Sequence, residues 1–239
     1  MQWTGEDDIK RKFLSGDIMN NILKMTLALA SISLPLQIQA IPITVFNAGF
    51  EAPAVGLTST PPANWTVSGG GAGVWNINAS PLGYWTVPAP EGNQIGFVSS
   101  APSPGSPATL SQVLSTALAA DTIYTLSGFV GHPIGYDSGT LYSTSLYAGG
   151  NLISSMSTAG PAGTFAPFNL VYNSSGSAFI GQALEIRLGS SQAQTAFDAI
   201  SLNAQGASGG GSVSEGGLTI LLLGMSLTSL GWIRRAMSE

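Results

Sequence analysis

Short apolar runs, each closed by glycine, proline, serine or asparagine, follow one another along residues 41–204. In Leu184–Leu188 the apolar side chains alternate with Glu185 and Arg187, which is typical of a strand with one buried face. The four residues AGGN at 148–151 stand between two apolar runs and predict a hairpin turn. By these criteria strands are expected at Ile43–Phe46, Asn64–Val67, Gly73–Ile77, Gln94–Val98, Thr109–Leu114, Ile123–Val130, Leu141–Ala148, Leu152–Ser157, Phe168–Tyr172, Leu184–Leu188 and Ala196–Leu202.

About ten short strands with no long helical pattern between them predict an all-β fold, a two-sheet antiparallel jelly-roll sandwich. The expected organisation is an N-terminal extension with a signal peptide at residues 1–40, the sandwich at 41–204, a Gly/Ser linker at 205–212 and a C-terminal tail at 213–239. The composition of the linker is typical of a flexible tether. A signal helix is therefore expected before the sandwich and a transmembrane helix after it.

The first of the two end segments has the pattern of a secretory signal peptide. Residues 25–36 (MTLALASISLPL) are apolar and uncharged, they follow Lys24, and the small residue Ala40 offers a cleavage position before Ile41. Acidic residues make the first 18 positions unusual for such a signal, so Met19 is an alternative start. A buried helix of the fold is the alternative interpretation of this run.

The second end segment predicts a membrane-spanning helix. Residues 218–233 (LTILLLGMSLTSLGWI) carry no charge and are followed at once by Arg234 and Arg235. Paired arginines favour the cytoplasmic side of a membrane, which would leave the sandwich on the outer side. The signal peptide predicts the same topology.

Val213-Ser214-Glu215-Gly216-Gly217, the apolar run and the terminal Arg234-Arg235 resemble the PEP-CTERM sorting signal, in its Val-Pro-Asp-Ser-Gly-like variant. Ser214 departs from the proline that is usual there, and Glu215-Gly216 also differ from the family. The resemblance implies export, attachment to the outer face of the cytoplasmic membrane, and delivery to the cell envelope, the surface or the exterior. The partners it implies are signal peptidase and an exosortase-like membrane protease. A plain membrane anchor without processing is the alternative.

Charge and cysteine content exclude several classes of function. Only 8% of the 239 residues are charged, and Arg187 is the only cation between Ile41 and Gly206. A nucleic-acid binder needs several cations on its phosphate-facing surface, so nucleic acid is not an expected partner. The chain has no cysteine, which excludes disulfides, thiolate metal sites and a cysteine nucleophile.

Several short phrases resemble the galactose-binding-like jelly rolls of carbohydrate-binding modules. They occur in the order of that family: residues 47–51 (NAGFE), Trp65, residues 110–112 (LSQ), residues 121–126 (DTIYTL) and residues 197–200 (FDAI). The resemblance implies a structural calcium ion where the first and last strands meet. Glu51 and Asp198 stand at the positions of its acidic ligands.

Asp198 also has a physical reason to need a partner. It has the parity of Ile200 and Leu202, so its side chain is expected to point toward the core. An unpaired buried carboxylate is costly, and a calcium ion with carbonyl oxygens would satisfy it. Hydrogen bonds to loop amides, or pairing with Arg187, are the alternatives. Apart from this ion no cofactor is expected.

No catalytic residue is expected. The sandwich has a single histidine, His132, and no lysine. His132 and Asp137 could join a serine on paper, but no serine has the sequence context of a nucleophile. The acidic residues are too scattered to predict the paired carboxylates of a glycoside hydrolase. The sequence thus predicts a protein that is not an enzyme.

Aromatic side chains suggest binding instead. Tyr84-Trp85 and Tyr136-Asp137 lie beside glycine and proline, which favours exposed loops, whereas Trp65 and Trp75 are expected in the core. Exposed rings with a neighbouring carboxylate suit sugar stacking. The leading interpretation is an exported envelope or matrix protein with a non-catalytic structural or adhesive sandwich. A surface carbohydrate-binding module that acts on extracellular polysaccharide is the alternative.

Overall fold

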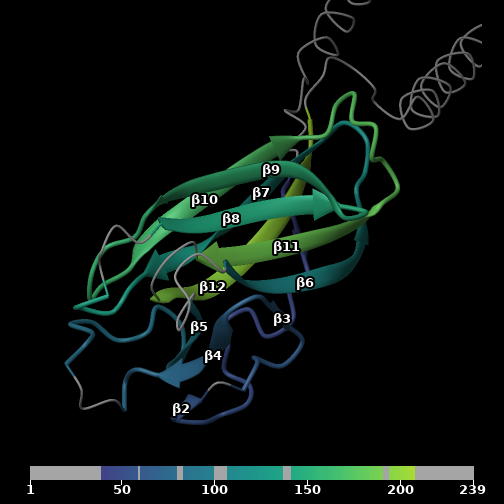
Figure 1. Ribbon diagram of the computed structural model, residues 1–239. Helices are drawn as coiled ribbons and strands as arrows, with labels where there is room; N and C mark the ends of the chain where they lie inside the picture. Colours follow the sequence, from purple (N-terminus) through teal and green to yellow (C-terminus); the bar gives the residue numbers. More distant parts are fainter. Residues whose placement is uncertain are drawn as a thin grey trace, which may run out of the picture. The chain divides into compact units, whose positions relative to one another are not determined.

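A computed structural model describes residues 39–58, 60–79, 83–99, 107–136, 141–190 and 194–207. These residues form an all-β sandwich of two antiparallel sheets, which confirms the expected fold class (Figure 1). The expected signal helix, most of the linker and the whole sorting tail with its transmembrane helix lie outside the described residues. Within the described part of the chain, no helix is long and apolar enough to cross a membrane.

The first sheet, called sheet A, contains both the beginning and the end of the described chain. Its central strand β12 pairs with β7 along one edge, and with β5 and then β1 along the other. In order, sheet A consists of β10 (Ala166–Asn173), β7 (Thr122–Gly131), β12 (Gln194–Gly206), β5 (Gln94–Ser99), β4 (Gly71–Asn76) and β2 (Leu57–Thr58), with β1 (Ile41–Ile43) also beside β12.

The second sheet, called sheet B, packs against sheet A. In order, it consists of β3 (Thr66–Ser68), β6 (Ala108–Ala117), β11 (Ala183–Ser190), β8 (Leu141–Ala148) and β9 (Asn151–Ala159). The turn between β8 and β9 is the predicted hairpin. Gly149 and Gly150 there have φ of 57° and 80°, and two successive positive φ values are the geometry that glycine adopts without strain.

The core lies between the two sheets and follows the alternation of each strand. Leu110, Leu126, Leu146, Ile186 and Leu202 are all buried there. Burying one such side chain contributes about 1.5–3 kcal/mol, so this layer supplies most of the driving force for folding. Trp65 lies in the same layer, as the sequence predicts.

A glutamine holds the first loop onto sheet B. The Gln112 side chain accepts a hydrogen bond from the Phe46 amide (2.8 Å) and donates to the carbonyl oxygens of Phe46 (2.9 Å) and Asn64 (3.1 Å). This contact keeps Phe46 in a turn, so the first strand ends at Ile43 instead of beginning there. The Leu110-Ser111-Gln112 phrase therefore has a structural role.

Strand β12 contains an irregularity that changes the expected direction of Asp198. Asp198 pairs with Phe129 and Ser201 pairs with Ser127, so three steps on β12 face two on β7. Ala199 has φ of 49° inside this bulge. Phe197 and Ile200 both face the core, whereas Asp198 points to the opposite face of sheet A. The parity prediction for Asp198 is wrong for this reason.

Candidate functional site

A second hydrophobic cluster covers the outer face of sheet A, the face away from the sandwich core. Trp75 and Ala196 belong to it, although their strand neighbours Val74 and Phe197 face the core. Trp75 is thus buried as expected, but not in the core between the sheets. The whole cluster consists of Trp75, Ile77, Ala89, Ile95, Phe97 and Ala196, with Tyr84, Trp85 and Phe165 packed against it.

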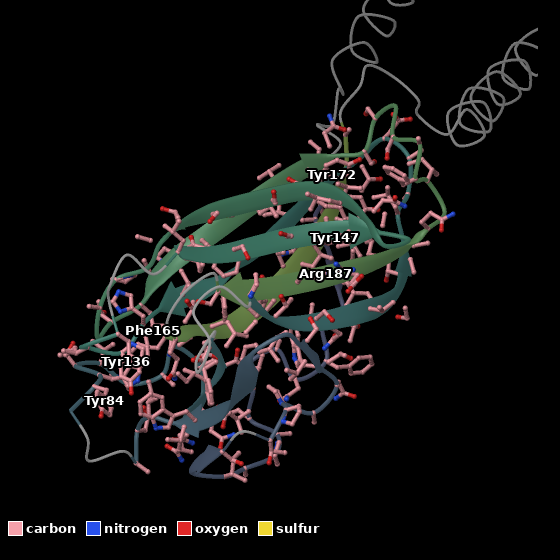
Figure 2. All side chains as sticks on the ribbon, viewed as in Figure 1. Tyr84, Tyr136, Tyr147, Phe165, Tyr172 and Arg187 are labelled. Atoms are coloured by element: carbon pink, nitrogen blue, oxygen red, sulfur yellow. The ribbon has the colours of Figure 1, made fainter. Side chains whose placement is uncertain are left out.

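Five rings of this region contact one another and form what we call the aromatic cluster: Trp75, Tyr84, Trp85, Tyr136 and Phe165. Trp85 stacks flat on Phe165 with centroids 4.5 Å apart, and its ring meets Trp75 edge-on at 6.2 Å. Tyr84 makes edge contacts with Trp75 (5.9 Å) and with Tyr136 (5.8 Å). Figure 2 shows Tyr84, Tyr136 and Phe165 together at one end of the sandwich. Ring faces of this kind attract flat ligands and cations.

Three loops carry these rings, and main-chain hydrogen bonds join the loops. The amide of Ile134 donates to the Tyr84 carbonyl (3.0 Å), and the amide of Thr86 donates to the Gly163 carbonyl (2.8 Å). The Gly163 amide in turn donates to the His132 carbonyl (2.7 Å). We call this the three-loop network. Because its bonds come from the backbone, the arrangement of the loops does not depend on the ring side chains.

A glycine lets one of these loops approach the sheet. A Cβ atom on Gly131 of β7 would lie 2.0 Å from the Thr164 carbonyl oxygen, closer than any real contact. Only glycine therefore permits the loop that carries Phe165 to lie against β7 at this point.

Asp198 lies on the same face of sheet A as the aromatic cluster. Its side chain is 0% exposed, and Ala196, two residues earlier on the same face, is part of the cluster's floor. Its Oδ2 accepts a hydrogen bond from the Glu91 amide (2.8 Å) and its Oδ1 from the Ala199 amide (2.7 Å). Glu91 follows Ala89 on the loop that also contributes Tyr84 and Trp85, so this loop covers the carboxyl group.

The surroundings of Asp198 favour its protonated form. Burial is the largest effect and raises the pKa of this carboxyl to about 7, and the nearby negative charges of Glu91 and Glu51 raise it further. The two backbone amides act in the opposite direction but do not offset the burial. A carboxyl group with such a pKa can donate a proton at neutral pH.

Arg187 does not neutralise this carboxyl. It lies on the outer face of sheet B, where its guanidinium binds both oxygens of Glu185 (2.8 and 2.9 Å). The same group stacks 3.7 Å from the ring centroid of Tyr147, and Figure 2 shows the two side chains next to each other. Loop amides are therefore the observed partners of Asp198, which was one of the alternatives from the sequence.

Glu51 closes the same corner from the other side. Its Oε1 accepts hydrogen bonds from the amides of Asn93 and Gln94, both at 2.8 Å, at the start of β5. Among the described residues, no group of three or more histidine, cysteine, aspartate or glutamate side chains could hold a metal ion. The calcium ion at Glu51 and Asp198 stays a prediction, and carbonyl oxygens would have to complete its shell.

The other residues singled out by sequence divide into three groups. Tyr84, Trp85 and Tyr136 are brought together in the aromatic cluster. His132 is buried, and its Nδ1 lies 3.2 Å from the Pro133 carbonyl, so it serves the turn. Outside the described residues are Asp137 and the sorting motif Val213, Ser214, Glu215, Gly216, Gly217, Arg234 and Arg235.

Comparison with protein families gives a single match. Residues 41–203 match the family model HpiC1-like, described as HpiC1 cyclase. The match spans the whole sandwich from β1 almost to the end of β12. No curated protein is significantly similar to the chain in sequence.

Comparison with solved structures points the same way. A Stig cyclase, Fisc from Fischerella sp. TAU, in complex with (3Z)-3-(1-methyl-2-pyrrolidinylidene)-3H-indole, is 25% identical, with a TM-score of 0.64 over 71% of this chain and 100% of that one. A cyclase from Fischerella sp. TAU in complex with 4-(1H-indol-3-yl)butan-2-one is 26% identical, with a TM-score of 0.63 over 70% and 99%. Carbohydrate-binding jelly rolls also match, such as the CBM22-1 xylan-binding domain from Paenibacillus barcinonensis Xyn10C, at 15% identity and a TM-score of 0.42 over 70% and 94%.

These matches overturn the functional interpretation drawn from the sequence. A non-catalytic structural or adhesive protein, its carbohydrate-binding alternative and the absence of enzyme activity were expected, but the family and the similar structures are those of cyclases. The search for a site was directed at nucleophiles, histidine and paired carboxylates. A single acid beneath aromatic rings has no such signature in sequence, because burial is what gives it a perturbed pKa.

Proposed function

Because this chain belongs to the HpiC1-like family of cyclases, we propose that it is an enzyme that closes a ring in an indole-bearing small molecule. One observation carries this proposal, namely that Asp198 is buried with a raised pKa on the face of sheet A that bears the aromatic cluster. A proton donor next to apolar, electron-rich walls is what an acid-triggered cyclisation needs.

The proposed reaction begins with proton transfer from the Asp198 carboxyl to a carbon–carbon double bond of the substrate. The carbocation that results closes the ring by bonding to a second unsaturated carbon. Loss of a proton from this cation completes the reaction, so substrate and product are isomers. Each ring face near the cation contributes about 0.5–2 kcal/mol of attraction, and apolar walls keep water from trapping the cation.

The indole part of the proposal rests on the ligands of the similar structures. Both Fischerella complexes hold a compound that contains an indole ring system. A flat bicyclic ring suits stacking against tryptophan and phenylalanine, and Trp85, Trp75 and Phe165 are such surfaces here.

The test of this function is conversion of 3-alkenylindoles to products of unchanged mass, followed by liquid chromatography and mass spectrometry. We expect Asp198→Asn to lower the rate by about a hundredfold or more, the usual effect of losing a general acid. Asp121→Asn is the matched control, because Asp121 is exposed and asparagine tolerates its positive φ of 47°. Equal rates for Asp198→Asn and the wild type would contradict the assignment.

We also propose a structural calcium ion at the corner of Glu51 and Asp198. Three carboxylates, those of Glu51, Glu91 and Asp198, are close enough to influence one another there, and the region has no cation of its own. Glu51 is the better ligand of the two predicted residues, because burial favours the neutral form of Asp198. Chelation with EGTA should then lower the melting temperature of the wild type and not that of Glu51→Gln.

Export remains a proposal that rests on the sequence alone. The apolar run at residues 25–36 and the motif, apolar run and paired arginines at 213–235 support a secreted cyclase that is sorted through its tail. Intact mass of the mature protein from its own host tests this. Retention of residues 218–239 would contradict processing of the tail.

A further inference from the structure

Trp85 brings a polar group without a partner into the aromatic cluster. Its indole Nε1 is buried, and it has no hydrogen-bond acceptor among the described residues. Trp65 shows the usual behaviour of a buried tryptophan in this chain, because its Nε1–H donates to the Asn47 carbonyl at 3.2 Å. A buried donor that loses water without gaining an acceptor costs free energy, so the state of Trp85 calls for a reason.

The direction of the Trp85 N–H is fixed by its neighbours. One face of the ring lies flat on Phe165, with an interplanar angle of 0°, and Trp75 meets the ring at 71°. The side chains packed around it on the floor of the cluster are hydrocarbon, as in Ile95, Phe97 and Ala196, and none of these can accept a hydrogen bond. The ring cannot turn toward an acceptor without breaking the stack, so the acceptor has to come to the ring.

We propose that the Trp85 Nε1–H is the donor that selects and orients the substrate of the cyclase site, by binding an acceptor atom such as a carbonyl oxygen or an imine nitrogen. This inference rests on the proposed function. Stacking alone leaves a flat ligand free to rotate in its own plane, whereas one hydrogen bond at a fixed position removes that freedom. The selected substrate class is therefore indoles whose side chain carries a hydrogen-bond acceptor.

The position of Trp85 relative to the acid fits this role. Trp85 and Glu91 lie on the same loop, and the Glu91 amide binds Asp198. The loop is fixed on its other side by the bond from the Thr86 amide to the Gly163 carbonyl. One element thus carries the donor that holds the substrate and the amide that holds the proton donor, which keeps the two groups in register.

The experiment measures, by isothermal titration calorimetry, the affinity of the full-length protein for two ligands that differ in one group. The ligands are 4-(1H-indol-3-yl)butan-2-one, which has a ketone acceptor, and 3-butylindole, which lacks it. We expect the wild type to prefer the ketone by about tenfold, since an unpaired buried donor is the cost of binding the alkyl compound. In Trp85→Phe, which keeps a flat ring but has no N–H, the preference should fall to about one, with binding of 3-butylindole retained.

Trp65→Phe is the matched control, because it removes an indole N–H that is already paired in the core, and it should keep the ketone preference. The ratio of two affinities does not depend on the fraction of folded protein. Equal affinities in the wild type, or a preference that survives in Trp85→Phe, would overturn the inference while indole binding stands. Failure of both ligands to bind would contradict the proposed indole substrate, and the inference would fall with it.

Discussion

The chemistry of Asp198 depends on what the chain leaves out of its surroundings. Arg187 is the only cation in residues 41–206, and it is engaged with Glu185 and Tyr147 on the other sheet. The nearest charges to Asp198 are therefore the carboxylates of Glu91 and Glu51, which add to the effect of burial. An aspartate placed in this way is an acid at neutral pH without a histidine or a metal ion beside it.

The pH dependence of cyclisation follows from this. The protonated form of Asp198 is the active one, and its pKa is raised to about 7. We expect kcat/KM to be level below pH 7 and to fall about tenfold for each further pH unit above it. A profile measured from pH 5 to 9 that falls with a midpoint near 4, or that rises with pH, would show that Asp198 does not act as the proton donor.

At the same scale, the sequence identified more residues of the site than it could arrange. The FDAI phrase drew attention to Asp198, and the turn residues next to Tyr84, Trp85 and Tyr136 predicted loop aromatics. The direction of Asp198 was wrong because a bulge interrupts the alternation on which the prediction relied. Phe165 was missed because nothing in a glycine-rich loop predicts that its ring stacks on Trp85.

Among the elements, strands with regular alternation were predicted well and irregular ones were not. Leu141–Ala148 has the predicted bounds, since every second residue is apolar and the hairpin glycines mark its end. β2, with two residues, has no periodicity to detect. The loops that carry the aromatic cluster are placed by long-range backbone bonds, such as that between Ile134 and Tyr84, and these have no local signal in the sequence.

The three-loop network predicts an effect of a residue that touches no ligand. In Gly131→Ala the new methyl group would meet the Thr164 carbonyl oxygen, and the loop with Phe165 must move away from β7. We expect a loss of about 1–3 kcal/mol in stability, as for other overpacked sites, together with weaker binding of 4-(1H-indol-3-yl)butan-2-one. Denaturant unfolding and calorimetry measure the two effects.

Gly56→Ala is the control for this substitution, because a Cβ atom at Gly56 meets nothing within 4 Å. It should leave both stability and binding unchanged. If Gly131→Ala binds the ligand as tightly as Gly56→Ala does, the position of the Phe165 loop does not matter to the site.

At the scale of the whole domain, the site lies far from the chain ends of the sandwich. Ile41 pairs with Ala204, six residues beyond Asp198 on β12, which corresponds to about 20 Å of extended strand. Figure 2 shows Tyr172, whose pairing partner Tyr124 also pairs with Ala204, at the opposite end from Tyr84, Tyr136 and Phe165. Segments attached at either end of the sandwich therefore leave the aromatic end accessible.

The central claim is that Asp198 starts a cyclisation by protonating the substrate, and the direct measurement is incorporation of deuterium. The wild type and Asp198→Asn are incubated with a 3-alkenylindole in deuterated water, and the cyclic product is analysed by mass spectrometry and NMR. Protonation of a carbon–carbon double bond predicts one deuterium on carbon in the wild-type product and no product above background with Asp198→Asn. A cyclic product without deuterium on carbon, or the same labelled product from both proteins, would contradict the account.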